Sequence, residues 1–362
     1  MLSVGRAPSG LWEDPGAAHR SEFRIGGVSV RVAGSRPDDV TLLPSLSPFR
    51  AEGHACDITI QVEWAEGLGP PAGRPLFDSG SVWRLYADGC GFQFDFSAPT
   101  LGTQLYKRLF VDDQFRRARL QMNARSFAGA ERAAVPLEYP LDELLIMHRL
   151  TQENGIELHS CGIARPGGTG NLFVGHSGAG KSTTTRLWTE REDVEILSDD
   201  RIIVRRDEGG SEAGTPRGDA GSAEGKAILR LCDRSASPTR HFAQDDRLKT
   251  NHFGQDAKPK KTSGMRMYGT PWHGEAMYAS PNSTPLSRIF ILEHGRGNAI
   301  TPLSPSQAVA ELFARSFVPF HRHEYVDSAL EFLQELVNSV PVYRYAFEPD
   351  RRAVETIINF HD

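Results

Sequence analysis

The chain has 362 residues, about twice the usual size of one domain, which predicts one large or two modest domains. Hydrophobic residues make up 39% of it and charged residues 24%, the composition of a soluble globular protein. The net charge of -5 argues against a nucleic-acid partner, and no apolar run approaches the roughly 20 residues needed to cross a bilayer.

The cysteines and the N-terminus indicate the compartment. Cys56, Cys90, Cys161 and Cys232 are far apart and form no Cys-x-x-Cys pair, which favours neither a zinc site nor a disulfide framework. The N-terminus lacks the continuous apolar stretch of a signal peptide. We therefore expect a cytoplasmic protein with reduced thiols and no membrane span.

Residues 1–20 are polar and rich in glycine and proline, and we expect them to form a flexible tail. From 21 to 139 the pattern has period two. Asp57 to Trp64 alternates apolar and polar residues, and Asp88-Gly89 separates two such runs, which is typical of a hairpin. The pattern predicts an antiparallel β-rich N-terminal domain. We interpret it as a structural or dimerising platform, which would make the protein a homo-oligomer, with substrate docking as the alternative.

The period-two pattern of the sequence ends near residue 140. Four residues then follow helical spacing: Leu141, Leu144, Leu145 and His148. Beyond Gly155, short apolar strands alternate with turns and helices, which predicts an α/β domain over 140–362. A polar, glycine-rich stretch at about 207–264 interrupts this pattern, and we expect it to be an insertion.

Residues Gly175 to Thr183 read Gly-His-Ser-Gly-Ala-Gly-Lys-Ser-Thr and match the pattern G-x-x-x-x-G-K-S/T in full. An apolar strand precedes the motif and a helix is expected to start within it. The glycines let the backbone wrap around phosphate, and the helix N-terminus adds free N–H donors. The expected nucleotide-binding residues are Gly175, Ser177, Gly178, Ala179, Gly180, Lys181, Ser182 and Thr183. Lys181 is expected to reach the β- and γ-phosphates of ATP, and the Ser182 hydroxyl to ligate Mg²⁺.

A second motif, Ile196-Leu-Ser-Asp199-Asp200, follows at short distance. Asp199 lies 199 − 182 = 17 residues after Ser182. That distance fits one helix and a returning strand, whose end would carry the two carboxylates beside the glycine loop. Carboxylates there either ligate Mg²⁺ or accept a proton from an incoming hydroxyl.

These motifs resemble a known family. The run His159-Ser-Cys-Gly162, the glycine loop and the run Leu-Ser-Asp199-Asp200-Arg201 together resemble the catalytic domain of HPr kinase/phosphorylase, whose fold is related to phosphoenolpyruvate carboxykinase. Gly269-Thr-Pro-Trp-His-Gly-Glu275 is similar to lasso-peptide precursor kinases. The resemblance implies an α/β P-loop kinase domain, here preceded by an antiparallel β-rich N-terminal domain.

The resemblance also implies residue roles. Asp199 corresponds to the acid/base that deprotonates the substrate serine, and Asp200 to a residue that assists metal binding or holds the hydrogen bonds of the site. His159 matches a histidine near the transferred phosphate, so that the implied catalytic residues are Asp199, His159 and Lys181, and the implied metal ligands Ser182 and Asp200. HPr kinases carry a Glu-x-Arg-Gly segment where this chain has Arg266-Met-Tyr-Gly269, and the missing glutamate argues against HPr as the substrate and against phosphorolysis.

The function expected from these motifs is transfer of the γ-phosphoryl group of ATP to a serine-type hydroxyl of a small protein or peptide. One alternative is a kinase of a small molecule such as free serine. Others are a nucleotide-binding regulator without transfer activity and a transport ATPase, although the Leu-Ser-Gly-Gly-Gln signature of transport ATPases is absent. A further histidine pair, His321 and His323, has poor spacing for a metal and is interpreted as a solvated helix start. The sequence does not identify the acceptor.

Overall fold

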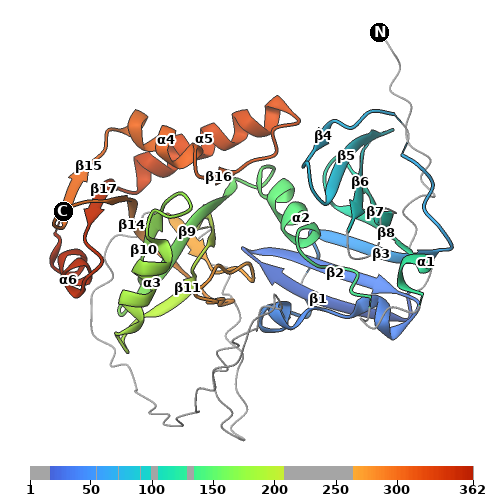
Figure 1. The fold of residues 1–362 in the computed structure, drawn as a ribbon, viewed down its shortest axis with the longest axis horizontal. Coiled ribbons are helices and arrows are strands. Elements are labelled where there is room, and N and C mark those ends of the chain that lie inside the picture. The colour runs from blue at the N-terminus through green and yellow to red at the C-terminus, as the bar shows by residue number, and fades with distance from the viewer. Residues whose placement is uncertain are drawn as a thin grey trace, which may run out of the picture.

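The computed structural model describes most of the chain. The described residues are 17–53, 55–71, 73–89, 91–98, 105–128, 134–207 and 264–361. Nearly all of the expected tail at 1–20 and of the expected insertion at 207–264 therefore lies outside the described residues. The described chain forms two sheet-rich parts that lie end to end, with helix α2 (Leu141–Leu150) at their junction (Figure 1).

The N-terminal part is one sheet of eight described strands. These are β1 (His19–Ile25), β2 (Val28–Gly34), β3 (Ile58–Ala65), β4 (Phe77–Asp78), β5 (Trp83–Asp88), β6 (Gly91–Ser97), β7 (Leu105–Asp112) and β8 (Arg117–Asn123), and a short helix, α1 (Ala124–Phe127), follows them. Their order in the sheet is β1-β2-β3-β8-β7-β6-β5-β4. The β5–β6 hairpin turns at Gly89, whose φ of 55° favours glycine, and this confirms the hairpin predicted at Asp88-Gly89.

The N-terminal sheet is mixed and not purely antiparallel. β2 pairs with β3, and β3 pairs with β8, in parallel, while the other five strand pairs are antiparallel. Between β2 and β3 the chain crosses over through η2 (Pro37–Val40) and η3 (Pro44–Phe49). A long crossover of this kind allows parallel pairing, whereas a tight turn imposes antiparallel pairing. The expectation of an antiparallel region is therefore wrong for these two pairs.

Helix α2 packs into the N-terminal core. Leu141 and Leu145 belong to the same apolar cluster as Leu120 of the first sheet. The core of the second part begins with Ile156, in the strand that follows the helix. The first apolar cluster thus includes α2, because the helical pattern indicates an apolar face but not which sheet covers it.

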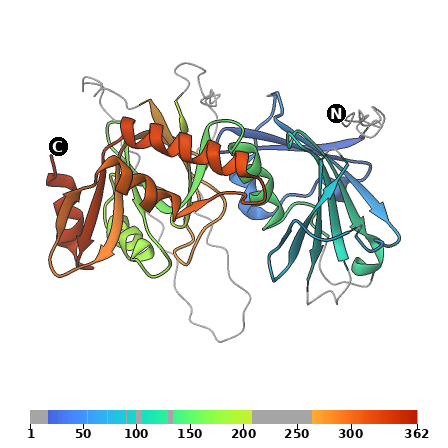
Figure 2. The same cartoon turned by 90° about the horizontal axis from the view of Figure 1, so that it is seen from above.

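Two histidines meet at the junction of the two parts. The side chain of His148 is 1% exposed and stacks on Phe115, with ring centroids 4.4 Å apart. The ring of His321 lies 5.2 Å from that of His148. His321 precedes α5 (His323–Ser339), which reaches from the second part toward α2 (Figure 2). His321 is therefore half-buried and not solvated, because the packing of α5 against the N-terminal part partly covers it, whereas His323 is exposed at the helix start as expected.

We expect acid to weaken this junction. Burial, and then the charge of His321, lowers the pKa of His148 to about 3. Burial and the charge of Arg322 lower the pKa of His321 to about 4. Both folded values lie below 6.5, so the unfolded chain binds more protons in acid. The contribution of the two uncharged histidines to the free energy of unfolding is complete above pH 6.5. It is lost as the pH falls toward 4 and then 3.

Urea unfolding at pH 7 and pH 5 measures this loss. At pH 5, which is 1.5 pH units below the ordinary value, His148 alone is expected to cost about 2 kcal/mol of unfolding free energy. A His148→Leu variant has no group to protonate at this position and should lose correspondingly less stability between the two pH values. An unchanged pH dependence in this variant would contradict the prediction.

The C-terminal part contains the second sheet. Its strands are β9 (Gly155–Arg165), β10 (Thr169–Val174), β11 (Glu195–Ser198), β12 (Arg201–Arg206), β13 (Met265–Tyr268), β14 (Ser283–His294), β15 (Ala299–Pro302), β16 (Ser316–Phe317) and β17 (Val342–Phe347). The strands β9, β12, β13, β14 and β10 pair in a closed ring, since β10 pairs with both β9 and β14. β14 lies between β10 and β17 and is parallel to both.

Helices pack on both faces of these parallel strands. Leu172 of β10 lies in a cluster with side chains of α4 (Pro305–Phe313) and α5. Phe173, the next residue, lies in a second cluster with side chains of α3 (Lys181–Thr189) and α6 (Arg351–Asn359). The alternating side chains of β10 thus contribute to two apolar layers, one on each face of the strand. The chain leaves β10 at its carboxyl end, where crevices for ligands form in such sheets.

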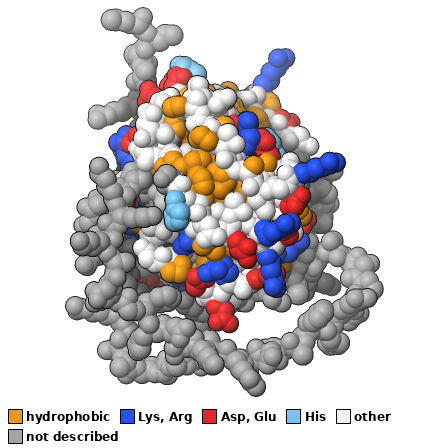
Figure 3. Space-filling view, turned by 90° about the vertical axis from the view of Figure 1, so that its left-hand side faces the viewer, with side chains coloured by type: hydrophobic (Ala, Val, Ile, Leu, Met, Phe, Trp, Pro, Cys, Tyr) orange, Lys and Arg blue, Asp and Glu red, His pale blue; other side chains and the backbone are white. Residues whose placement is uncertain are grey.

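The surface and the helices add two general observations. On the face at the α6 end of the molecule, charged side chains of both signs surround a small group of apolar side chains (Figure 3). Within the described ranges, no helix has the length and apolarity to span a membrane. Cys161 is a buried free thiol and Cys56 is half-buried, while Cys90 and Cys232 lie outside the described residues.

Candidate active site

The glycine-rich motif forms the loop between β10 and α3, at residues 175–180. Gly178 and Gly180 have φ values of 82° and 101°, in the left-handed region that favours glycine. A Cβ on Gly180 would lie 2.6 Å from the Phe347 ring, and one on Gly175 would lie 2.7 Å from the Cβ of Ala179. The backbone therefore makes a tight turn that side chains at these positions would prevent.

Helix α3 begins directly after this loop, with its N-terminus open. Its N-cap is Gly180, which has no side chain to accept hydrogen bonds from the first-turn N–H groups, and no acidic residue occupies the first turn. Uncapped N–H groups together with the helix dipole favour a bound anion. Ser182 and Thr183 lie half-buried in this first turn, and Ser177 lies exposed in the loop. The arrangement fits the phosphates of a nucleotide.

Lys181 is folded into the curve of the loop. Its side chain is buried, and Nζ donates hydrogen bonds to the carbonyl oxygens of Gly175 (3.0 Å) and His176 (3.2 Å). The same Nζ lies 4.0 Å from Oδ1 of Asp200. Burial lowers the pKa of Lys181 below its usual value. The ammonium group is thus held where the loop surrounds it, beside a carboxylate.

Asp200 and His159 are brought together by strand register. In the β9–β12 pair, Arg201 lies opposite His159, so Asp200, which immediately precedes β12, falls beside the histidine. Nε2 of His159 donates a hydrogen bond of 2.8 Å to Oδ1 of Asp200. Burial alone would raise the pKa of Asp200, but this hydrogen bond and the charges of Arg201 and Lys181 outweigh it and hold the pKa below its usual value. The carboxylate therefore stays ionised at neutral pH.

Asp199 is in a different environment from Asp200. Its carboxylate is 1% exposed and accepts hydrogen bonds from the backbone N–H groups of Gly274 (3.0 Å), Ala276 (2.8 Å) and Tyr278 (3.2 Å). The side chain of Asp200 is 24% exposed. A carboxylate offers about four lone-pair sites, and Asp199 already uses three of them on this loop. Asp199 therefore anchors the segment that follows Gly269, whereas Asp200 is open toward Lys181.

The structure adds residues to the site that the motifs did not single out. Arg201 forms an ion pair with Asp200, and its guanidinium lies 4.2 Å from the centre of the Phe317 ring. The charge of Arg315, followed by burial, lowers the pKa of His176 in the loop. His294 donates from Nε2 to the carbonyl of Gly178, at 2.6 Å. Arg201 follows the Asp-Asp motif directly, but no sequence spacing pointed to the other contacts.

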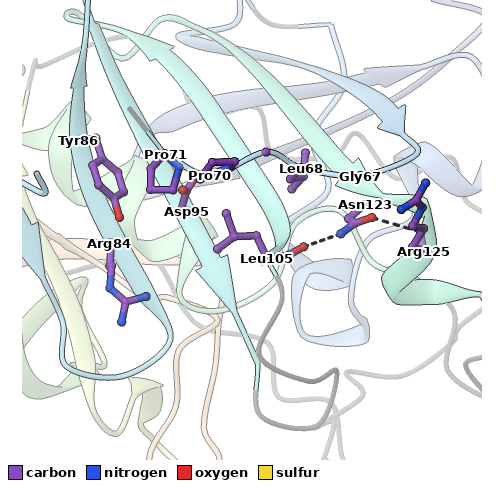
Figure 4. Close-up of a pocket in the computed structure, with 11 residues that line it drawn as sticks. Gly67, Leu68, Pro70, Pro71, Arg84, Tyr86, Asp95, Leu105, Asn123 and Arg125 are labelled. Atoms are coloured by element: carbon purple, nitrogen blue, oxygen red, sulfur yellow. Dashed lines mark hydrogen bonds between the residues drawn. The ribbon is translucent and has the colours of Figure 1, made fainter. Parts of the chain in front are cut away.

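A cavity of about 660 Å³ lies elsewhere, on the N-terminal sheet. Side chains from β5 to β8 line it, with the segment 67–71 across one side (Figure 4). Asp95 at this cavity is 2% exposed and forms an ion pair with Arg108, with 2.6 Å between Oδ1 and Nε. That carboxylate is already paired inside the sheet. Since the cavity contains neither the glycine loop nor the Asp-Asp motif, its volume does not mark the candidate active site.

Comparisons with known proteins do not assign this chain to a family. No family model matches its sequence. No curated protein matches it either. The glycine motif and the geometry around Lys181 and Asp200 therefore remain the indications of function.

Proposed function

We propose that the protein is an ATP-dependent kinase, similar to HPr kinase, that phosphorylates a serine-type hydroxyl of a small protein or peptide. The observation that carries this proposal is the convergence of three side chains beside the glycine loop. Lys181 Nζ lies 4.0 Å and His159 Nε2 lies 2.8 Å from the same oxygen of Asp200. A lysine in a glycine loop binds phosphate, and a carboxylate beside it adds a group for the transfer step.

The loop provides what a triphosphate requires. The open N-terminus of α3 and the ammonium of Lys181 supply donors and positive charge. The Ser182 hydroxyl and the Asp200 carboxylate would hold Mg²⁺, an ion that takes oxygen ligands and usually binds only one or two protein groups in such sites. When bound, ATP supplies the phosphoryl group and Mg²⁺ offsets the charge of the phosphates.

We assign the role in the transfer step to Asp200 and not to Asp199. Its carboxylate is the more exposed of the pair, and His159 and Arg201 orient it by hydrogen bonds. From this position it accepts the proton of the acceptor hydroxyl or binds the metal ion. The three backbone contacts of Asp199 support a positioning role, in contrast to the acid/base role that the family resemblance implies for it.

The test is transfer of labelled γ-phosphate. The purified full chain is incubated with labelled ATP and Mg²⁺, with serine-containing peptides, with free serine, or with no acceptor. Label on a peptide would support the proposal, and label on free serine would favour the small-molecule alternative. Release of free phosphate in every reaction, with no labelled acceptor, would favour a transport-ATPase-like or regulatory role. A chain that binds no ATP would overturn the proposal.

A further inference from the structure

The first turn of α2 faces the candidate active site, although the helix packs in the N-terminal core. Asp142 and Glu143 begin this turn and are 4% and 7% exposed. Buried carboxylates are unfavourable unless they are paired or hydrogen-bonded, and an apolar core alone would not favour them. Each carboxylate has a hydrogen-bond partner in the C-terminal part. Each partner is connected in turn to one residue of the Asp-Asp motif.

Glu143 leads to Asp200 through Arg201. Nε of Arg201 donates a hydrogen bond of 2.8 Å to Oε1 of Glu143, and Nη1 of the same arginine donates to Oδ2 of Asp200. Glu157, on β9, lies 3.4 Å from this Nε, and the ring of Phe317 lies under the guanidinium. Because the guanidinium is planar, the bond at Nε fixes the direction in which Nη1 points. The orientation of Asp200 thus depends on Glu143.

Asp142 leads to Asp199 through Trp272. The indole Nε1 donates a hydrogen bond of 3.0 Å to Oδ2 of Asp142, and the Trp272 side chain is buried in the N-terminal apolar cluster. The Trp272 carbonyl accepts a hydrogen bond of 3.4 Å from Ser198, next to the Asp-Asp motif. Gly274, two residues further on, donates to Asp199. Asp142 therefore holds the start of the loop that anchors Asp199.

We infer that Asp142 and Glu143, which belong by packing to the N-terminal part, are positioning residues for the two carboxylates of the active site. Neither touches the glycine loop, so both act through Trp272 and Arg201. The catalytic part of this inference rests on the proposed function. The physical coupling between α2 and the loop at 274–278 is independent of the proposed function, and it can be measured without catalytic turnover.

Hydrogen exchange tests the coupling directly. Asp142→Ala leaves the Trp272 indole without its acceptor, and exchange of the amides of Gly274, Ala276 and Tyr278 should become about five- to tenfold faster, the factor expected for one lost hydrogen bond. Asp142→Asn keeps one of the two oxygens, which can accept from the Trp272 indole while the bond from the Glu143 backbone N–H is lost, and exchange at these amides should be slower than in Asp142→Ala. Exchange at wild-type rates in Asp142→Ala would overturn the inference for this residue.

Steady-state ATP hydrolysis tests Glu143. Glu143→Gln keeps an acceptor for Arg201 but removes the charge, and kcat should fall about tenfold or more while KM for MgATP is unchanged, because the glycine loop is not altered. Glu138→Gln is the matched control. It removes another acid of an ion pair in the N-terminal part, with Lys107 at 2.9 Å, and should leave kcat unchanged.

The outcomes of these experiments distinguish the inference about α2 from the proposed function. A wild-type kcat in Glu143→Gln, or an equal loss in Glu138→Gln, would overturn the inference for Glu143. A wild-type chain that neither binds nor hydrolyses ATP would overturn the proposed function, and the exchange rates of the Asp142 variants would still decide whether α2 positions the loop.

Discussion

Asp200→Asn is expected to lower the rate of phosphoryl transfer by about 10²–10⁴ at saturating MgATP, the range typical for loss of a general base. The amide is nearly isosteric but cannot take up the proton of the acceptor hydroxyl. The affinity for ATP should change little, because the glycine loop and Lys181 remain. Single-turnover transfer gives the rate, and calorimetry gives the affinity. If Asp200 serves the metal instead, the rate will recover as Mg²⁺ is raised.

Asp199→Asn is the matched comparison for this prediction. An asparagine replaces one carboxylate oxygen by an NH₂ group, which cannot accept hydrogen bonds from the backbone N–H groups that Asp199 now binds. We expect faster amide exchange at residues 274–278 and a smaller loss of rate than in Asp200→Asn. The reverse ranking, with unchanged exchange in the loop, would contradict our assignment and favour the acid/base role that the family resemblance implies for Asp199.

Lys181→Ala is expected to weaken ATP binding by about 10- to 150-fold. A charge-assisted hydrogen bond contributes about 1.5–3 kcal/mol, and this change removes the ammonium that would contact the β- and γ-phosphates. Calorimetric titration with MgATP measures the effect. Without ATP the variant should remain folded, because the hydrogen-bond partners of Nζ are two backbone carbonyls and Asp200, its neighbour at 4.0 Å, keeps its hydrogen bonds from His159 and Arg201.

Arg186→Ala is the control for the lysine variant. Arg186 lies on the same helix, carries the same charge and is exposed, with an ion pair of 3.8 Å to Glu275. Its removal changes the net charge by the same amount, yet it should leave the affinity for ATP unchanged. Equal affinities of the Lys181→Ala variant and the wild type would remove the phosphate-binding role from the glycine loop.

The sequence alone determined the local features of this protein. The hairpin at Asp88-Gly89 follows from turn chemistry, and α2 follows from helical spacing, so both were predictable from neighbouring residues. The strand, loop and helix around Lys181 also follow from a local pattern, because a backbone that wraps a phosphate needs glycines at short, regular intervals. For the same reason the position of Asp200 beside this loop could be expected from one helix and one returning strand.

Only the tertiary structure decided how distant segments combine. Asp199 and Asp200 lie in the turn between β11 and β12, and the β9–β12 register and the loop at 274–278 determined that Asp199 is enclosed while Asp200 meets His159. The parallel pairing of β2, β3 and β8 depends on a crossover with no local signal. The packing of α2 with the first sheet and the partial burial of His321 depend on which surfaces the chain brings together. Such contacts join residues far apart in sequence, and no short-range pattern specifies them.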